Sequence, residues 1–481
     1  MYSCQIRLRQ QLDVLADMVR TPNFGGSINS IGSELEVYII DQNGHTKPIN
    51  KQLITEVGDP RLSLELNRFN LEYNLSPVSA VGHPFTLMAN EMHELLDIVD
   101  HSAAIHQARI VPIGILPTLT QENISIDSIT DLSRYKALSN GLQQLRGTPF
   151  NVHINGKDPL TFKCNDISLE GANTSFQVHL RTPLKNYCNT WNALQLATPL
   201  VLALAANSPT LFGHSLWSET RIALFKQSVD NRKRGELNWR KPARVSFGHG
   251  WLRTGPWENF AENVALHEPI LPVCCHGDAA ETLDQGDIPR LEELRLHQST
   301  VWSWNRAVFD PELGGHFRIE CRSLPAGPTV ADMTANAALL IGLAIGLRDE
   351  MPYLIPTFPF PMAEYNFYRA AQLGLDAKIL WPQTKQISPA EVNLTEVLHQ
   401  LMPVAEKGLL ILGVEQQEIS KVLGNIQNRL DRKISGAIWQ NQMLASLQQD
   451  HSREEALHLM LERYITEMHK GHSVVNWSQF V

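Results

Sequence analysis

The stretch GSELEVYII, residues 32–40, decides the fold of this chain. Successive side chains of a β-strand point to opposite faces of the sheet, so Glu34 and Glu36 would share one face. The aliphatic residues that alternate with them would share the other face, which is the pattern of a half-buried strand. The sequence therefore predicts a sheet with one apolar face and one acidic face.

The stretch SLELNRFNLEYNL, residues 63–75, continues this pattern and reads as a hairpin with Asn67 and Arg68 at the turn. If the loop has two residues, the leucines and aromatic residues fall on one face and the polar residues on the other. Glu65 and Glu72 would then be near neighbours on the polar face.

Two later stretches repeat the alternation, SFQVHL at residues 175–180 and HFRIECRSL at residues 316–324. Apolar residues alternate in both with side chains that carry charge or hydrogen-bonding groups. The residues on their polar faces are Gln177, His179, Arg318, Glu320 and Arg322.

Together, the four segments place five glutamates, one histidine and two arginines on polar faces, with no lysine among them. Any one glutamate pair is more often a solvated strand face, and a lone histidine such as His179 is more often structural. Adjacent carboxylates repel one another unless a multivalent cation or an arginine neutralises them, and the joint pattern therefore favours a metal site. Oxygen ligands with a single imidazole suit Mg²⁺ or Mn²⁺ better than zinc.

The composition limits the classes of function. The chain has 481 residues, of which 43% are hydrophobic, and a formal net charge of −9, so it can bury a large core and has no basic field for nucleic acid or an anionic membrane. The N-terminus reads as an amphipathic helix without a signal sequence, and the longest apolar runs are too short to span a bilayer. The six cysteines lack C-x-x-C spacing, which fits free thiols in the cytoplasm; the pair Cys274–Cys275 is interpreted as part of a loop rather than a soft-metal site.

Strands and helices are mixed without regular alternation, which indicates an α+β fold with a largely antiparallel sheet. We expect helices at residues 86–107, 191–206, 217–231 and 330–347. Residues 351–382 are rich in proline and aromatic residues, which indicates an irregular packed connection rather than a flexible linker. From residue 388 to about 470 the pattern is helical. The predicted domains are a catalytic unit at residues 1–385 and a C-terminal helical region at residues 386–481.

No G-x-x-x-x-G-K-[ST] loop is present, and FGHGWLRTG at residues 247–255 matches a dinucleotide fingerprint poorly. Metals and arginines would have to hold any nucleotide. The glycine-rich residues 247–255 are a candidate lid, and Arg221 on the predicted helix 217–231 reads equally well as a surface residue or a functional one.

At these same residues the sequence resembles the glutamate-cysteine ligase family, in particular its bacterial carboxylate-amine ligase branch. GSELEVY resembles the opening Glu-x-Glu strand of that family, and SLELNRFNLEYNLSP its second acidic segment. GANTSFQVHL resembles the strand with the metal-binding histidine, and HFRIECRSLPAGPTVADMTANAALL the late Glu-x-Arg strand and the helix after it. The stretch ALAANSPTLFGHSLWSETRIALF resembles the segment that carries a downstream arginine, here Arg221. The resemblance covers residues 30–350, with a looser match at ISGAIWQ in the C-terminal region.

The resemblance implies a glutamine-synthetase-like fold, in which an antiparallel sheet forms a funnel for ATP, metals and substrates, with helices around it and a C-terminal helical region. It implies Mg²⁺ or Mn²⁺ as the metal and ATP as the co-substrate. The implied metal ligands are Glu34, Glu36, Glu65, Glu72, His179 and Glu320. The implied catalytic residues are Arg322, Arg221 and Glu320, and the implied nucleotide-binding residues are Arg322, Arg221 and Gln177. Arg318 and the segment LWSETR depart from the family pattern, which leaves the amine acceptor open.

The expected function is ATP-dependent joining of a carboxylate to an amine through an acyl phosphate, with glutamate and cysteine as the leading substrates and γ-glutamylcysteine as the product. One alternative is the same chemistry with a different amino acid or amine. A second alternative, from another class, is a non-catalytic binding or regulatory protein that keeps the fold. The expected partners are small molecules rather than nucleic acid or membrane, and a homo-oligomer is left open.

Overall fold

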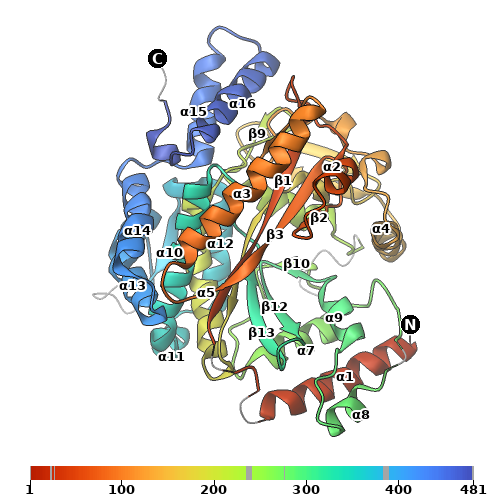
Figure 1. The fold of residues 1–481 in the computed structure, drawn as a ribbon. Coiled ribbons are helices and arrows are strands. Elements are labelled where there is room, and N and C mark those ends of the chain that lie inside the picture. Colours follow the sequence, from red (N-terminus) through yellow and green to blue (C-terminus); the bar gives the residue numbers. More distant parts are fainter. Residues whose placement is uncertain are drawn as a thin grey trace.

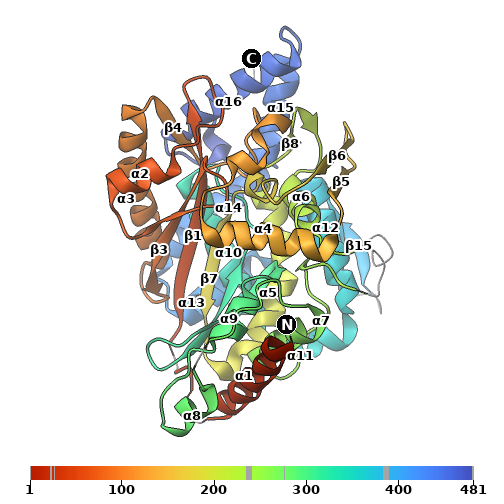
Figure 2. The same ribbon diagram turned by 90° about the vertical axis from the view of Figure 1, so that its right-hand side faces the viewer.

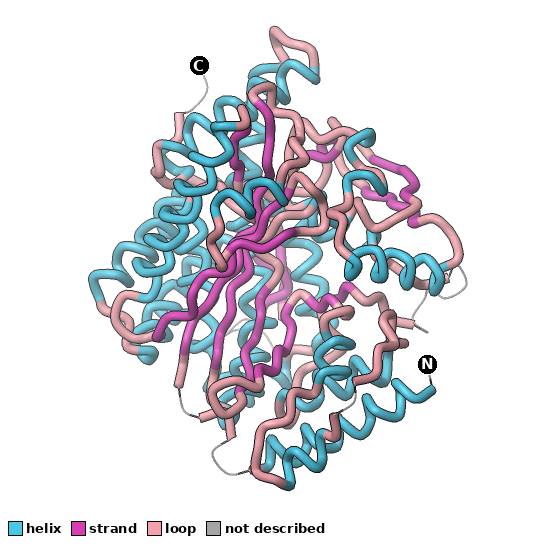
Figure 3. Tube along the Cα trace, turned by 45° about the vertical axis from the view of Figure 1, so that its right-hand side comes forward, coloured by secondary structure: helices cyan, strands magenta, loops and turns pink. Residues whose placement is uncertain are grey.

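The computed structural model describes residues 2–21, 24–26, 28–233, 241–275, 277–382 and 389–478. A seven-stranded antiparallel sheet forms its centre, in the order β12-β13-β7-β1-β3-β2, with β4 also paired to β1 (Figures 1 and 3). The strands are β1 (Ser30–Asp41), β2 (Leu62–Leu64), β3 (Asn70–Ser79), β4 (Ala108–Val111), β7 (Phe176–Arg181), β12 (Asn305–Asp310) and β13 (His316–Cys321). The α+β class and the antiparallel sheet expected from the sequence are confirmed.

The acidic and apolar faces of the central strand β1 follow the predicted alternation. From Ser30 to Val37, every second residue is buried and those between are partly exposed. Leu35 and Val37 are fully buried in the core, whereas the intervening Glu34 and Glu36 lie on the other face. Register pairs Glu36 with Glu72 of β3 and Glu34 with Gln177 of β7, so the acidic face continues across three strands.

The predicted hairpin has the expected register but a wider turn. Ser63 pairs with Glu72 and Leu64 with Leu71, as a two-residue loop would require. The ladder stops at Leu64 and Asn70, however, so Glu65 lies in the connecting loop instead of on a strand. Contacts outside the hairpin hold this loop in place. Asn67 forms a β-bridge with Ile129, and its side chain donates a hydrogen bond to the Ser168 carbonyl.

Helices pack over the apolar face of the sheet. These are α3 (Pro84–Ile105), α5 (Leu184–Ala205), α10 (Val330–Leu347), α13 (Leu394–Leu412) and α14 (Gln416–Asp431), and α10 lies among the other four (Figure 1). In the described part of the chain, one helical stretch, Val330–Thr357, has the length and apolarity to cross a membrane. The uninterrupted apolar run within it is shorter than a bilayer-spanning segment, as the sequence indicated. Its most apolar window is 94% buried inside the protein, so this stretch is a core helix.

Further elements surround the sheet. The predicted N-terminal helix, α1 (Tyr2–Arg20), packs with α7 (Pro256–Leu266), α8 (Ala279–Asp284) and α9 (Glu292–Gln298) beside the β12 edge. In Figure 2, α4 (Ser133–Arg146) crosses in front of the strands, on the side away from α13. The remaining elements are α2 (Asn50–Val57), α6 (Thr220–Ser228) and the short strands β5 (Phe150–Ile154), β6 (Leu160–Cys164), β8 (Thr210–Leu211), β9 (His214–Ser215), β10 (Val245–Ser246) and β11 (Trp302–Ser303).

The expectation of an irregular connection at residues 351–382 is wrong. This segment contains α11 (Met351–Leu354), α12 (Phe360–Leu373) and β14 (Lys378–Trp381). Pro352, Pro356 and Pro361 stand at helix starts, where a missing N–H costs nothing, and Pro359 precedes α12 as its N-cap. The aromatic residues pack as expected, since Phe367 stacks on Phe247 with ring centroids 4.6 Å apart.

The C-terminal region begins with β15 (Ala390–Asn393), which pairs with β14, before the expected helices start. After α13 and α14 come α15 (Gly436–Leu447) and α16 (Arg453–His469). The Tyr464 hydroxyl of α16 donates to the Pro112 carbonyl at 2.9 Å and accepts from the Asn207 amide at 2.9 Å. The C-terminal helices are thus tied into the core, and the division at residue 385 stays a prediction.

We expect the Gly408→Ala substitution to destabilise the fold at the crossing of α10 and α13. A Cβ atom at Gly408 would overlap the backbone carbonyl oxygen of Gly342, so the two helices would have to move apart. Such overpacking costs about 1–3 kcal/mol, which urea unfolding would detect. Gly424→Ala in α14 is the matched control, because no atom lies within 4 Å of its Cβ position and alanine favours helix by up to about 1 kcal/mol. Equal stability of the two variants would contradict the close packing.

Candidate active site

The polar faces of four strands meet on one side of the sheet. Besides the pairs on β1, His179 of β7 lies opposite Glu320 of β13, and Glu320 lies opposite Arg306 of β12. Directly opposed residues in an antiparallel pair project to the same face. The alternation in the sequence therefore brings Glu34, Glu36, Glu72, Gln177, His179 and Glu320 to one surface.

Glu34, His179 and Glu320 form the tightest group on this surface. One ligand atom from each lies within 4.8 Å of the others. The His179 Nε2 atom is 3.4 Å from Glu34 Oε1 and 3.8 Å from Glu320 Oε2. The same Nε2 is buried and has no hydrogen-bond partner in the described part of the chain. A buried nitrogen left without a partner between two carboxylates is an arrangement that a cation would complete.

The imidazole of His179 is held in its neutral form. Burial lowers its pKa to about 4, despite the nearby charge of Glu320, which acts in the opposite direction. A metal ligand must be neutral imidazole, so this side chain needs no proton loss near neutral pH.

A second group of carboxylates surrounds Glu36. Burial, and then the charge of Glu72, raises the pKa of Glu36, and burial with the charge of Glu34 raises the pKa of Glu72 to about 7. Glu65, in the loop after β2, also has a pKa raised well above its usual range by burial and by Glu72. Burial, and then the charge of Glu320, likewise raises the pKa of Glu34 to about 7. The structure therefore brings all five predicted glutamates into one mutually repelling cluster.

Arginines neutralise only one of these carboxylates fully. Burial alone would raise the pKa of Glu320, but the guanidinium groups of Arg306 and Arg322 outweigh it and hold that pKa well below its usual range. Arg306 Nη2 lies 2.9 Å from the Glu320 carboxylate, and Arg322 also forms a hydrogen-bonded ion pair with it. The Arg322 guanidinium donates as well to Gln177 Oε1 at 2.9 Å, and Gln177 Nε2 donates to Glu36 Oε1 at 3.0 Å.

Arg221 is a buried residue of α6 and not a surface arginine, with only 3% of its surface exposed. Its guanidinium lies 3.2 Å from Glu219 Oε1 and donates to the Ser323 carbonyl at 3.1 Å, directly after Arg322. Glu219 in turn accepts from the Asn207 backbone N–H at 2.9 Å. The Asn207-Ser208-Pro209 turn thus fixes Arg221 beside the end of β13.

A cavity of about 520 Å³ opens beside the Glu34–His179–Glu320 group. Glu34 and His179 line one end of it, and Arg181 and Arg318 contribute positive charge to the wall. An apolar part of the wall comes from β3 at Leu75, Pro77 and Val78. Asp310 and Glu312 also line the cavity, and Asp310 is paired with Arg318 at 3.0 Å. Such a mixture suits a small organic molecule that carries charged groups.

Three residues that the sequence patterns missed contribute to this site. Arg306 could have been found, because NRAVFD at residues 305–310 alternates as the other strands do. No pattern marks Glu170, whose pKa burial and then Glu36 raise to about 8, because it lies in a 3₁₀ turn (Glu170–Ala172). No sequence pattern identifies Glu219 either, because it contributes to the site by its ion pair with Arg221. The candidate lid at residues 247–255 lies elsewhere: Phe247 and Leu252 are hydrogen-bonded to α5, on the apolar side of the sheet.

Comparison with known proteins agrees with this geometry. Residues 30–462 match the family model described as glutamate-cysteine ligase family 2. A provisionally named glutamate–cysteine ligase 2-1 of Frankia alni is 23% identical over 81% of this chain and 86% of its own length. A provisionally named glutamate–cysteine ligase 2 of Thermobifida fusca is 30% identical over 23% of this chain, a match that spans 29% of that relative.

Among solved structures, the glutamate–cysteine ligase of Francisella tularensis in complex with AMP superimposes with a TM-score of 0.56. The superposition covers 93% of this chain and 90% of that chain, at 10% sequence identity. At this identity the likeness concerns the fold alone. The fold is the glutamine-synthetase-like α+β fold that the sequence resemblance implied.

Proposed function

This chain belongs to glutamate-cysteine ligase family 2, a family of ATP-dependent carboxylate-amine ligases, and we propose that it joins glutamate to cysteine to form γ-glutamylcysteine. The observation that carries the proposal is the buried group of Glu34, His179 and Glu320, with Glu36, Glu65 and Glu72 around it. Five glutamates that repel one another inside a protein are costly unless they bind something of opposite charge.

Mg²⁺ or Mn²⁺ fits this donor set, since four of the carboxylates form no ion pair with an arginine among the described residues and the one imidazole is neutral. We propose Glu34, Glu36, Glu65, Glu72, His179 and Glu320 as the ligands, as the sequence analysis did. When bound, such cations would neutralise the phosphate oxygens of ATP and make transfer of the γ-phosphoryl group easier.

In the proposed reaction, an oxygen of the glutamate side-chain carboxylate attacks the γ-phosphorus of ATP, and ADP leaves. Arg322 and Arg221 are the proposed contacts for phosphate or substrate carboxylate, because both lie at the end of β13 and hydrogen bonds already orient their guanidinium groups. Prepositioned charges of this kind stabilise a transition state without reorganising. Gln177 joins Arg322 to Glu36, so its proposed contribution is to hold the arginine in place.

The second step needs no covalent enzyme nucleophile. The amine nitrogen attacks the carbonyl carbon of the acyl phosphate, inorganic phosphate leaves, and the nitrogen loses a proton. The cavity of about 520 Å³ beside the Glu34–His179–Glu320 group would hold the reactants, with Arg181 and Arg318 facing the anionic groups of the reactants. The same chemistry with another amine is the second candidate, favoured by the departures at Arg318 and LWSETR. A cytoplasmic location and a homo-oligomer stay predictions.

The test is ADP release by the purified chain with Mg²⁺ and ATP, in the presence of glutamate alone, glutamate with cysteine, and glutamate with a panel of other amines. We expect release to require both glutamate and cysteine, and we expect a new mass equal to γ-glutamylcysteine. The matched control is the Glu462→Gln variant, because the Glu462 carboxylate pairs with Arg109 of β4 at 2.6 Å, is 44% exposed and lines neither the acidic cluster nor the cavity.

Release that requires a different amine would keep the ligase and replace cysteine as the acceptor. Absence of release in every mixture, from protein that is folded by circular dichroism, would contradict the catalytic proposal and favour the non-catalytic alternative. Loss of activity in Glu462→Gln equal to that in variants of the acidic cluster would contradict the residue assignment.

A further inference from the structure

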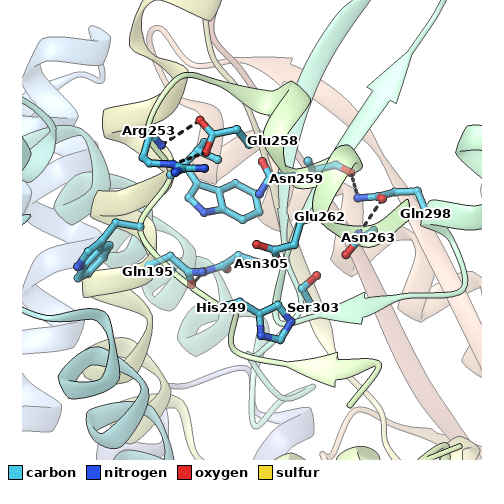
Figure 4. Close-up of a pocket in the computed structure, with 16 residues that line it drawn as sticks. Gln195, His249, Arg253, Glu258, Asn259, Glu262, Asn263, Gln298, Ser303 and Asn305 are labelled. Atoms are coloured by element: carbon cyan, nitrogen blue, oxygen red, sulfur yellow. Dashed lines mark hydrogen bonds and ion pairs between the residues drawn. The ribbon is translucent and has the colours of Figure 1, made fainter. Parts of the chain in front are cut away.

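A second cavity lies on the other side of the sheet, at the edge strand β12. It has a volume of about 340 Å³ and is enclosed by β12, α5, α7 and the glycine-rich residues 247–255 (Figure 4). The side chains important to its chemistry are Trp191, Gln195, Trp251, Asn259, Glu262 and Asn305. In Figure 4 the carboxylate of Glu262 points toward the amides of Gln195 and Asn305.

Strand alternation separates this cavity from the acidic cluster. Arg306 pairs with Glu320 on the acidic face, whereas its neighbours Asn305 and Ala307 pair with the buried residues Cys321 and Ile319 of the apolar face. Asn305 and Ala307 line the cavity. A ligand here would therefore be divided from the proposed ligase site by the backbone of β12.

Hydrogen bonds fix the orientation of the Asn305 amide. Gln195 Nε2 donates to the Phe247 carbonyl at 2.9 Å, so Gln195 Oε1 must accept, and Asn305 Nδ2 donates to it at 2.8 Å. The Thr198 hydroxyl, which uses its own hydrogen on the Leu194 carbonyl, accepts from the same Asn305 nitrogen. Asn305 Oδ1 is left without a partner in the described chain, on a residue with no exposed surface.

Two further donors that line this cavity are used within the protein. Trp251 Nε1 donates to the Phe358 carbonyl at 2.8 Å, and Asn263 Nδ2 donates to Gln298 Oε1 at 2.8 Å. Acceptors are not used in this way, because Asn259 Oδ1 is buried without a partner. Hydrogen-bond acceptors at this cavity are therefore left without donors among the described residues.

Glu262 adds a negative charge to this surplus. No ion pair or hydrogen bond to its carboxylate is found among the described residues, and the nearby Arg253 is paired with Glu258 at 3.1 Å. Burial, and then the charge of Glu258, raises the pKa of Glu262, as expected for a carboxyl group that lacks a counter-charge.

We propose that this cavity binds a compact organic cation with a primary ammonium group, such as a diamine or a basic amino acid. An ammonium group offers three donors and one positive charge, which matches Glu262 with the unpaired oxygens of Asn259 and Asn305. The indole rings of Trp191 and Trp251 border the same space, and aromatic faces attract cations. A metal ion fits less well, because only one carboxylate of this cavity is without an arginine.

The test is isothermal titration of the full-length chain, without ATP or metal, using putrescine and L-lysine as probes. The uncharged 1,4-butanediol and the dianion succinate are the controls for ligand charge. We expect at least one of the two amines to bind, and neither control to do so. Glu262→Gln should weaken binding at least tenfold, the equivalent of about 1.4 kcal/mol. Glu268→Gln, at an exposed glutamate just beyond α7, is the matched control and should bind as the parent does.

Two more variants make the outcome decisive. Asn259→Ala removes an acceptor of a half-buried side chain and should also weaken binding, which provides a second readout if Glu262→Gln folds poorly. Glu34→Gln should leave binding unchanged, because the amine would occupy a different site from the ligase substrates. The proposal is overturned if neither amine binds, if the diol binds equally well, if Glu262→Gln and Asn259→Ala bind as tightly as the parent, or if Glu34→Gln abolishes binding. None of these results depends on ligase activity.

Discussion

Glu34→Gln is expected to lower the rate of ADP release by about 10²–10³-fold, the range found when one preorganised group that stabilises transition-state charge is lost. Glu34 lies 3.4 Å from His179 Nε2 and belongs to the group of three ligand atoms within 4.8 Å. The amide keeps the shape of the side chain but removes the charge that would attract a cation. Steady-state kinetics at saturating ATP would measure the loss.

The same variant should fold as well as the parent without metal. Burial and the charge of Glu320 both disfavour the ionised form of Glu34, so a neutral amide removes repulsion from the cluster. Thermal unfolding should show an unchanged or higher midpoint without Mg²⁺, and a smaller rise when Mg²⁺ is added. Unfolding well below the parental temperature would mean that Glu34 has a structural role, and unchanged turnover would remove it from the proposed ligand set.

Glu320→Gln, in contrast, is expected to lose both turnover and stability. Glu320 is 1% exposed and is paired with Arg306 and Arg322, whose side chains are each 16% exposed. Removing the shared carboxylate leaves two guanidinium groups without their partner, and breaking a buried pair in this way costs about 3–5 kcal/mol. Urea unfolding of the metal-free protein would measure this loss.

The Asp310→Asn variant is the matched control for Glu320→Gln, because it breaks an arginine pair on the same two strands but near the surface. Such exposed pairs contribute about 0–1 kcal/mol. Combining Glu320→Gln with Arg306→Leu should restore part of the lost stability, since one unpaired charge is removed. If Glu320→Gln and Asp310→Asn are equally stable, the buried ion pairs of Glu320 do not contribute the expected free energy of unfolding.

The acidic face of the sheet could be predicted because strand alternation fixes the face of the sheet to which each side chain points. Once Glu34 and Glu36 lie on one strand, the period of two leaves only the register between strands unknown. The apolar faces then set that register, since a shift by one residue would expose the core side chains of β1 and β7. The convergence of His179 with Glu320 follows from this rule and from the order of the strands.

Other features depend on contacts that no local pattern encodes. Glu65 leaves the strand because Asn67 is held by residues 129 and 168, distant in the sequence. The segment 351–382 forms helices although its prolines suggested an irregular connection, since the prolines before residue 362 occupy positions at helix starts where helices tolerate them. The cavity beside Asn305 arises from three segments, around residues 195, 250 and 260, that meet only in the folded chain.

The most direct test of the proposed metal site is anomalous diffraction at the manganese edge from crystals grown with Mn²⁺ and a non-hydrolysable ATP analogue. We expect an anomalous peak between Glu34, His179 and Glu320, with oxygen and nitrogen atoms at about 2.0–2.2 Å. A peak elsewhere, or none at this position in crystals that contain the bound analogue, would contradict the assignment of the acidic face as the metal-binding centre of a ligase.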